Sequence, residues 1–385
     1  MRPKAIILTL PVEINQGIFS YLDNKSLRSC ALTCRRWTPS AQYILFGRAR
    51  VSSPASVTTL VNVLGKSAPL RVLVRDLTIC GRLKESIQCW ISMSGNVHLE
   101  TLFPSAVLLP RLRVLRFEYW DPVQLRPKFW ARLRQFGGVS DLHLRCCHFY
   151  ASSHIEDLLF SFPRLVSLTL DSVRWGGDRE QMFVQRPGYH DRVLPLQRLS
   201  ICNPYEYGPI FQWLKLHRAL SVRHLELIRF DFFNVQRAAV YVKEVGSSLE
   251  SLTLGLYLPA WCNPSARFID LGHNESLHTL SLQVYDVSED CVPWVNSVLV
   301  SAVELPLARI ELSFTLDHRK TLWTDAWGAI RDTLTAYWRP TLREVVFTHH
   351  AVPGFLQDAA PLVVERFKEL DERGVLSVVV DVQDS

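Results

Sequence analysis

The chain has 385 residues, of which 48% are hydrophobic and 21% are charged. This composition excludes intrinsic disorder and low-complexity polymers, and the length is ample for a sizeable core. No apolar run approaches the roughly 18 residues that a membrane span requires. The nine cysteines are scattered and form no CxxC pair. We therefore expect a soluble protein of a reducing compartment, in the cytoplasm, the nucleus or both.

The positive charge is concentrated at the start of the chain. Residues 1–140 contain 20 Lys and Arg against 7 Asp and Glu, whereas residues 141–385 contain 23 against 30. A basic first third favours an acidic partner for that part of the chain. Direct nucleic-acid binding is the rival interpretation, but aromatic residues do not alternate with the arginines there as a base-stacking surface requires.

The first fifty residues show a helical hydrophobic pattern. Leu10, Ile14, Ile18 and Leu22 are four residues apart, which places them on one helical face. Pro11 suits a first helical turn, because its missing N–H has no partner there. A second helical stretch is predicted from Asp23 or Asn24, with inner positions at Leu27, Cys30, Cys34, Trp37 and Ala41.

These residues resemble the F-box motif over residues 10–46. The matching elements are Leu10-Pro11, Glu13-Ile14, the run Ile18-Phe19-Ser20-Tyr21-Leu22, Leu27, and Cys30-x-Leu32-x-Cys34-Arg35-x-Trp37. The resemblance implies a helical hairpin that binds the small acidic Skp-type adaptor of Skp-cullin-F-box ubiquitin ligases, and through it the cullin and RING subunits. It also implies a set of adaptor-binding residues: Leu10, Pro11, Glu13, Ile14, Ile18, Phe19, Leu22, Leu27, Leu32, Cys34, Arg35 and Trp37. The alternative is a capped helical hairpin that begins an α/β domain and has no affinity for the adaptor.

An LxxLxL triplet recurs through the rest of the chain at a regular interval. Its first positions are Val74, Leu112, Val139, Leu165, Leu196, Val222, Leu249, Leu277, Leu307 and Leu342, with a weaker copy at Leu99. Helical patterns lie between the triplets, at 128–136, 155–162, 210–220, 235–245, 294–303 and 323–338. The pattern therefore predicts repeated strand-turn-helix units.

These units resemble leucine-rich repeats with an irregular pattern, as in F-box/repeat proteins of the fungal type. The full repeat signature is met only by Val139, Leu142, Leu144, Cys147 and Phe149. We expect an α/β protein in which an F-box hairpin (1–50) and a connecting segment (51–69) precede an irregular solenoid with a curved parallel sheet (70–350). A C-terminal cap (351–385) with a helix at 362–370 and a strand at 375–380 follows. An ordinary α/β domain with a flat mixed sheet is the alternative.

Alternation along each strand predicts one apolar face and one polar face. The predicted polar face is a candidate target-binding surface, and its residues are Asp141, His143, Arg145, Thr169, Asp171, Arg198, His224, Glu226, Thr253, Gln283, Arg309 and Glu311. A solvated face without a partner has the same composition. Among the tryptophans, we expect Trp213, Trp294, Trp323 and Trp327 in the core, and Trp120, Trp175 and Trp261 in contact positions after strands.

No phosphate-binding glycine loop, nucleophile elbow, HExxH or paired-CxxC spacing occurs in the sequence. Cys146-Cys147-His148 is the single tight thiol-imidazole cluster, and it lacks two further metal ligands. The sequence therefore predicts no enzyme and no cofactor. It favours a substrate-recognition adaptor of a ubiquitin ligase, with a repeat scaffold independent of such ligases as the alternative; the target protein, any modification that it carries and the oligomeric state are left open.

Overall fold

The computed structural model describes residues 10–81, 109–120, 131–149, 152–175, 193–203, 208–231, 235–257, 269–284, 291–314, 324–336, 341–351 and 359–382. These residues form two compact units. The first unit comprises Met1–Leu165 and Val173–Met182, and the second comprises Val166–Ser172 and Phe183–Ser385.

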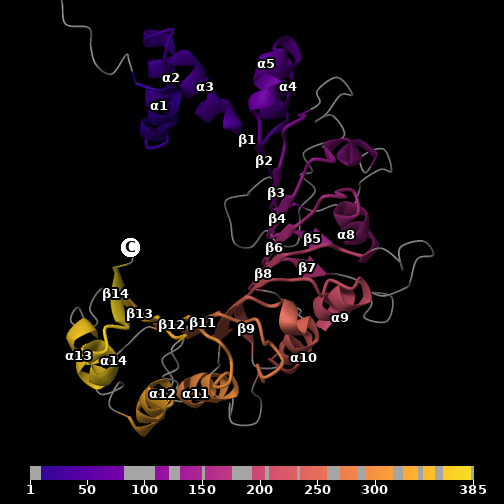
Figure 1. The fold of residues 1–385 in the computed structure, drawn as a ribbon. Helices are drawn as coiled ribbons and strands as arrows, with labels where there is room; N and C mark the ends of the chain where they lie inside the picture. The colour runs from indigo at the N-terminus through magenta and orange to yellow at the C-terminus, as the bar shows by residue number, and fades with distance from the viewer. Residues whose placement is uncertain are drawn as a thin grey trace, which may run out of the picture. The chain divides into compact units, whose positions relative to one another are not determined.

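The first unit begins with three helices, α1 (Val12–Phe19), α2 (Asn24–Thr33) and α3 (Thr38–Gly47) (Figure 1). Asp23 caps α2, because its carboxylate accepts a 2.7 Å hydrogen bond from the Ser26 N–H. Phe19, Leu27 and Ala41 form a small buried core between these helices.

The prediction of one continuous second helix is wrong, because the chain is extended at Cys34 between α2 and α3. Pro39 explains the break. It lies in the first turn of α3, whereas in a continuous helix its ring would clash and its missing N–H would leave the Arg35 carbonyl without a partner. The Thr38 hydroxyl closes the turn by donating a 2.7 Å hydrogen bond to the Ala31 carbonyl.

The sheet starts earlier than the predicted start of the solenoid at residue 70. Strand β1 (Arg48–Val51) pairs in parallel with β2 (Asp76–Cys80), and between them lie α4 (Pro54–Lys66) and α5 (Ala68–Leu73). Ser53 and Ser56 form a capping box at the start of α4. The segment 51–69, predicted as the connection between the two domains, thus contains α4 and the start of α5.

The first unit continues with further parallel strands. Among its described residues lie β3 (Val114–Glu118), η3 (Arg134–Phe136), β4 (Asp141–Arg145), β5 (His148–Phe149), α8 (Ser152–Leu159) and β7 (Arg174–Trp175). Strands β2, β3 and β4 pair in parallel, and β5 pairs with β7 in a small separate sheet.

The second unit repeats the same strand-helix alternation. Its strands are β6 (Ser167–Asp171), β8 (Arg198–Cys202), β9 (His224–Asp231), β10 (Ser251–Tyr257), β11 (Thr279–Val284), β12 (Arg309–Phe314), β13 (Glu344–Ala351) and β14 (Leu376–Val382). Its helices are α9 (Gly208–Leu216), α10 (Val235–Val245), η5 (Gly246–Ser248), α11 (Cys291–Ser301), α12 (Asp325–Ala336), α13 (Ala359–Arg366) and α14 (Lys368–Glu372).

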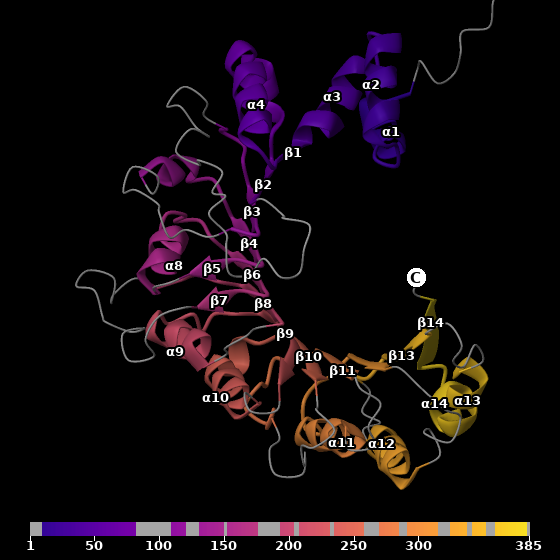
Figure 2. The ribbon, with the colours of Figure 1, turned by 180° about the vertical axis from the view of Figure 1, so that it is seen from behind.

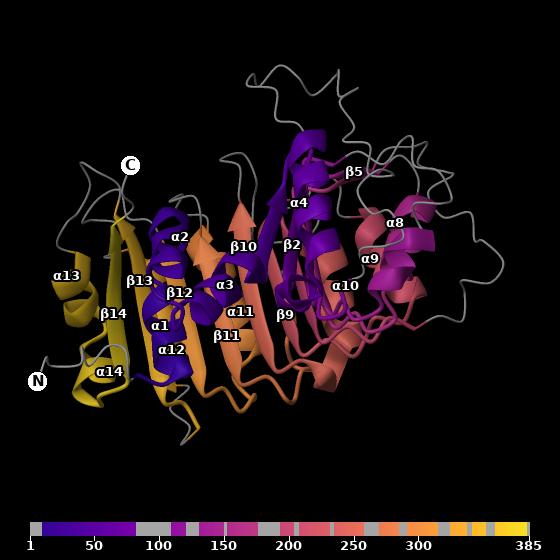
Figure 3. The ribbon, with the colours of Figure 1, turned by 90° about the horizontal axis from the view of Figure 1, so that it is seen from above.

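The strands follow one another in chain order in each unit, as β1-β2-β3-β4 in the first and as β6-β8-β9-β10-β11-β12-β13-β14 in the second. In the second unit each pair from β6 to β14 is parallel, and Figure 3 shows the arrows of β10 to β14 pointing the same way. Figure 2 shows α9, α10, α11 and α12 on one side of that unit's strands. The arrangement is consistent with an α/β solenoid-like fold.

Each of the ten LxxLxL triplets that begin between Val74 and Leu342 runs into a strand, as predicted. The weaker copy at Leu99 lies outside the described residues. Their inward side chains are buried, as Leu142 and Leu144 in β4 or Leu225 and Leu227 in β9 show. The predicted helices at 155–162, 210–220, 235–245 and 294–303 correspond to α8, α9, α10 and α11. Those at 323–338 and 362–370 correspond to α12 and to α13 with α14, and the last predicted strand is β14. The prediction at 128–136 falls partly outside the described residues.

A left-handed residue recurs where the strands end. In the first unit Tyr119 and Cys146 have positive φ, and in the second unit Ser172, Asn203 and Arg229 do. Arg229 coincides with a register shift between β9 and β10. Gly81 follows β2 without a positive φ, and an added Cβ there would lie 1.8 Å from the Tyr119 carbonyl oxygen. The left-handed residue thus recurs directly after β3, β4, β6 and β8 although the sequence around it varies.

Buried polar side chains join neighbouring repeats in the second unit. Asn274 is fully buried, and its amide donates 3.0 Å hydrogen bonds to the carbonyls of Val242 and Gly246 at the end of α10. The Tyr241 hydroxyl donates a 2.7 Å hydrogen bond to the Ala219 carbonyl. These three hydrogen bonds link neighbouring strand-helix units to one another.

The predicted core positions of the helical tryptophans are confirmed where the structure describes them, and the predicted contact position of Trp120 is wrong. Trp213, Trp294 and Trp327 are buried. Trp120 is also buried, because its ring stacks on Phe117 with a centroid distance of 4.4 Å. Trp323 and Trp261, and the side chain of Trp175, lie outside the described residues.

Candidate functional site

The three N-terminal helices leave an apolar surface uncovered. Val12, Ile14 and Ile18 in α1 are 47%, 50% and 43% exposed, and Leu32 in α2 is 89% exposed. Tyr21, between the two helices, is 91% exposed. So many large apolar side chains on about forty residues indicate a binding surface rather than a finished domain surface.

The predicted adaptor-binding residues divide into three groups. Pro11, Glu13, Ile14, Ile18, Leu32 and Arg35 are exposed, whereas Leu10, Leu22, Cys34 and Trp37 are half-buried. Phe19 and Leu27 are buried inside the helices' own core, where the Phe19 ring meets the Trp37 ring edge-on at 5.8 Å. These two side chains hold the helices together from within, and the exposed group forms the accessible surface.

Val12 and Tyr21 belong to the exposed surface and were not among the predicted adaptor-binding residues. Tyr21 lies inside the run of residues 18–22, so the motif itself contained the signal. Val12 lies beside the helical stripe that spacing identifies, and helical periodicity alone did not include it.

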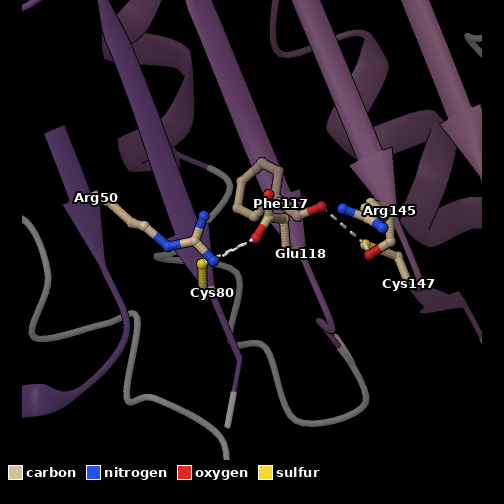
Figure 4. A network of polar contacts seen from close by, with 6 residues as sticks. All are labelled: Arg50, Cys80, Phe117, Glu118, Arg145 and Cys147. Carbon is tan, nitrogen blue, oxygen red and sulfur yellow. Dashed lines mark hydrogen bonds and ion pairs between the residues drawn. The ribbon is translucent and has the colours of Figure 1, made fainter. Parts of the chain in front are cut away.

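A second candidate surface is the polar face of the strands, which in the first unit is internally paired. The Glu118 carboxylate in β3 forms a 2.7 Å ion pair with Arg50 in β1 (Figure 4). It also accepts a 3.2 Å hydrogen bond from the Cys80 thiol in β2. Arg116 pairs with Asp76. The charged side chains Arg50, Glu118, Arg116 and Asp76 of this part of the face thus pair between neighbouring strands.

Two side chains of this face have displaced pKa values. Burial, followed by the charge of Arg116, lowers the pKa of His143 below its usual 6.5. Burial, followed by the hydrogen bond to Glu118, raises the pKa of the Cys80 thiol to about 12. His143 is therefore neutral at physiological pH, and Cys80 is a protonated, unreactive thiol.

In the middle of the second unit's polar face, two side chains are exposed and unpaired among the described residues. His224 and Glu226 on β9 are exposed, and among the described residues neither side chain has a hydrogen-bond or ion-pair partner. Beside them Thr253 on β10 is half-buried, and Ser281 on β11 is 5% exposed. His224 and Glu226 are thus the accessible side chains in this part of the face.

On the last strands, β12 to β14, polar side chains of the face again form ion pairs and hydrogen bonds with one another. Arg309 in β12 forms a 2.6 Å ion pair with Glu344 in β13. The Ser313 hydroxyl lies 2.7 Å from His350 Nε2, and His350 Nδ1 lies 3.1 Å from an Asp381 carboxylate oxygen. Ser313 is only 7% exposed, so we interpret this chain of contacts as a tie between β12, β13 and β14.

The structure places every predicted face residue on the polar side of its strand. The half-buried members are Asp141, His143, Thr169, Asp171, Thr253, Gln283, Arg309 and Glu311, and the exposed members are Arg145, Arg198, His224 and Glu226. Whether they bind a target stays a prediction.

Cys147 is the buried member of the thiol-imidazole cluster. Its sulfur lies 3.4 Å from the Phe117 carbonyl, and burial raises its pKa to about 12. In the part of the chain that the structure describes, no three His, Cys, Asp or Glu side chains are grouped as metal ligands.

Comparison with known families identifies one segment. Residues 7–42 match the family described as F-box-like, and this range contains α1, α2 and the start of α3. The chain thus carries an F-box-like domain, the type of domain that binds Skp-type adaptors. No curated protein matches the chain. None of the described helices combines the length and the apolar character that crossing a bilayer requires.

Proposed function

We propose that this protein is a substrate-recognition subunit of a Skp-cullin-F-box ubiquitin ligase. One observation carries the proposal: the F-box-like segment at 7–42 folds into helices that expose Ile14, Ile18 and Leu32. Each such side chain contributes roughly 1.5–3 kcal/mol when a partner buries it. The protein itself supplies no catalytic group in this role, and ubiquitin transfer depends on holding the target near the transferring enzyme.

We further infer that the strand-helix units are irregular leucine-rich repeats that hold the target. The parallel strands in chain order and the repeated left-handed turn support this assignment. The accessible part of the polar face, at His224 and Glu226, is the part that we assign to target contact. A carboxylate and an imidazole at that place favour a polar protein segment as the target.

The adaptor assignment is tested by co-purification with a Skp-type adaptor. The double variant Ile14→Asp/Ile18→Asp places two carboxylates on the exposed surface of α1, and we expect it to lose adaptor binding, because burying unpaired charge is costly. Both positions are about half exposed, so the helices stay folded. Val240→Asp, at a 49% exposed position of α10, is the matched control and should bind as the wild type does.

Wild-type binding by the double variant, with unchanged circular dichroism, would refute the docking surface. A wild-type chain that does not bind the adaptor would instead support the alternative, a repeat scaffold independent of ubiquitin ligases. The target surface is tested separately with His224→Glu/Glu226→Arg, which should keep the adaptor and lose the target.

A further inference from the structure

A serine, a histidine and an aspartate meet where the last three strands of the second unit end. Ser313, His350 and Asp381 are each the next-to-last residue of their strands, β12, β13 and β14. These neighbouring strands are parallel, so the three side chains lie at the same edge of the sheet (Figure 3). In open α/β sheets, ligands bind at the edge where the strands end. No sequence motif marks the group, because 37 and 31 residues separate its members.

The contacts between these side chains follow the order of a serine nucleophile and its base. The Ser313 hydroxyl lies 2.7 Å from His350 Nε2, and His350 Nδ1 lies 3.1 Å from an Asp381 carboxylate oxygen. An ionised carboxylate only accepts hydrogen bonds, so the proton of the neutral ring is held on Nδ1 and Nε2 keeps its lone pair. Nε2 then accepts the hydrogen bond of the serine hydroxyl and is placed to take its proton.

A neighbouring serine shows that the fold does not produce this arrangement by itself. Ser281 in β11 lies on the same face and is 5% exposed, close to the 7% of Ser313. Its register partner on β12 is Glu311, and among the described residues no imidazole contacts its hydroxyl. The hydrogen bond to a histidine therefore distinguishes Ser313 from a serine of the same burial.

The base is open to solvent, whereas the serine is more enclosed. The side chains of His350 and Asp381 are 31% and 54% exposed. Ser313 is 7% exposed. Water can thus exchange protons with the imidazole, and only a small acyl group has room to reach the serine hydroxyl.

Hydrogen-bond donors flank the serine on both sides. Gln283 on β11 and Thr348 on β13 are its register partners, and both are half-buried. Adjacent strands lie about 4.8 Å apart, so an amide group and a hydroxyl group stand on either side of Ser313. Donors beside a reacting carbonyl stabilise the negative charge that develops on its oxygen.

We propose that Ser313 is the nucleophile of a hydrolytic site for small acyl esters, with His350 as its base and Asp381 as the residue that positions His350. The Ser313 oxygen attacks the carbonyl carbon of the ester while its proton passes to His350 Nε2. The bond from this carbon to the alcohol oxygen then breaks, and the alcohol leaves with the proton from Nε2. Water attacks the acyl-serine in the same way and releases the carboxylic acid. The activity needs neither adaptor nor target, so it is independent of the proposed function.

The test treats the full chain with a biotinylated fluorophosphonate, which labels activated serines, and locates the label by peptide mass spectrometry. We expect labelling of Ser313 and hydrolysis of p-nitrophenyl acetate, and Ser313→Ala should lose both. Ser281→Ala, the matched control, should keep both. His350→Gln should slow labelling by about 100-fold or more, since general base catalysis contributes that much.

The positioning role of Asp381 is tested by the pH profile of the labelling rate. The wild-type rate should rise with pH between about 5 and 8, because only a neutral imidazole accepts a proton. Asp381→Asn should lower the plateau by about tenfold or more, because an amide donor permits the tautomer with the proton on Nε2. Asp381→Glu should restore part of the rate. A merely structural role would change the unfolding temperature and leave this profile as it is.

Absence of labelling at Ser313 in the folded wild type, or equal labelling of Ser281, would overturn the proposal. Ester hydrolysis that survives Ser313→Ala would assign the activity to another group and overturn it as well. Should circular dichroism show that Ser313→Ala is misfolded, Asp381→Asn decides, because its exposed position tolerates the change. An unchanged labelling rate in that variant would refute the assignment.

Discussion

The F-box-like helices and the strand-helix repeats differ in how completely they cover their own apolar side chains. The helices bury a core of Phe19, Leu27 and Ala41 and leave Leu32 89% exposed. The repeats bury their strand leucines almost completely, as Leu227 on β9 shows, and expose polar side chains such as Glu226. A short helical segment without enough surface to enclose its apolar residues needs a partner, whereas stacked repeats enclose each other's.

The largest effect is expected from truncating a leucine on either side of this comparison. Leu227→Ala should destabilise the second unit by roughly 2–5 kcal/mol, because it leaves a cavity in a fully buried layer. Leu32→Ala should change stability by less than about 0.5 kcal/mol, because its side chain is already in water. Urea denaturation with hydrogen exchange read by mass spectrometry measures both; equal losses would show that Leu32 is buried within the chain itself.

Glycine substitutions sharpen the comparison at the level of the backbone. Gly81→Ala should destabilise the first unit by about 1–3 kcal/mol or more, because its Cβ would lie 1.8 Å from the Tyr119 carbonyl oxygen and the adjoining strand turn must shift. Gly17→Ala, in α1, meets no atom within 4 Å and should stabilise the helix by up to about 1 kcal/mol. Thermal unfolding checks the opposite signs. A neutral Gly81→Ala would contradict the close approach of the two turns.

The smallest effect concerns the pH dependence of the paired face. Because the pKa of His143 is lowered in the folded chain, the unfolded chain binds the proton more readily below pH 6.5. Stability should therefore fall as the pH drops through 6.5 towards the folded-state pKa. His143→Gln should flatten this slope in denaturation curves between pH 5 and 7.5. An unchanged slope would exclude His143 as its source.

The strands were predictable because their signal is local and repeated. Each inward pair, such as Leu252 and Leu254, alternates with polar residues, and the interval recurs, so a chance match at one place matters little. Strand β1 was missed because Arg48 and Arg50 make it look like a charged loop, and it is a strand only because β2 pairs with it. The break at Cys34 was missed because the apolar spacing continues through it.

The candidate site also has a part that the sequence identified and a part that only the structure reveals. The motif identified the exposed Ile14 and Ile18 together with the buried Phe19 and Leu27, because spacing along a helix marks an apolar side chain without saying which surface covers it. The contacts of Ser313, His350 and Asp381 could not be found from the sequence, since these side chains are brought together only by the stacking of repeats.

The sequence by itself therefore determined the helical start, the repeating strand-helix units and the polar character of one sheet face, because helical and strand periods are properties of neighbouring residues. Tertiary structure alone decided which apolar side chains the chain covers, which charges pair as Arg50 and Glu118 do, and which arginines line one pocket together with Arg75. Burial and pairing depend on residues far apart in the chain, and only the stacked strands bring those residues to within a few ångströms of one another.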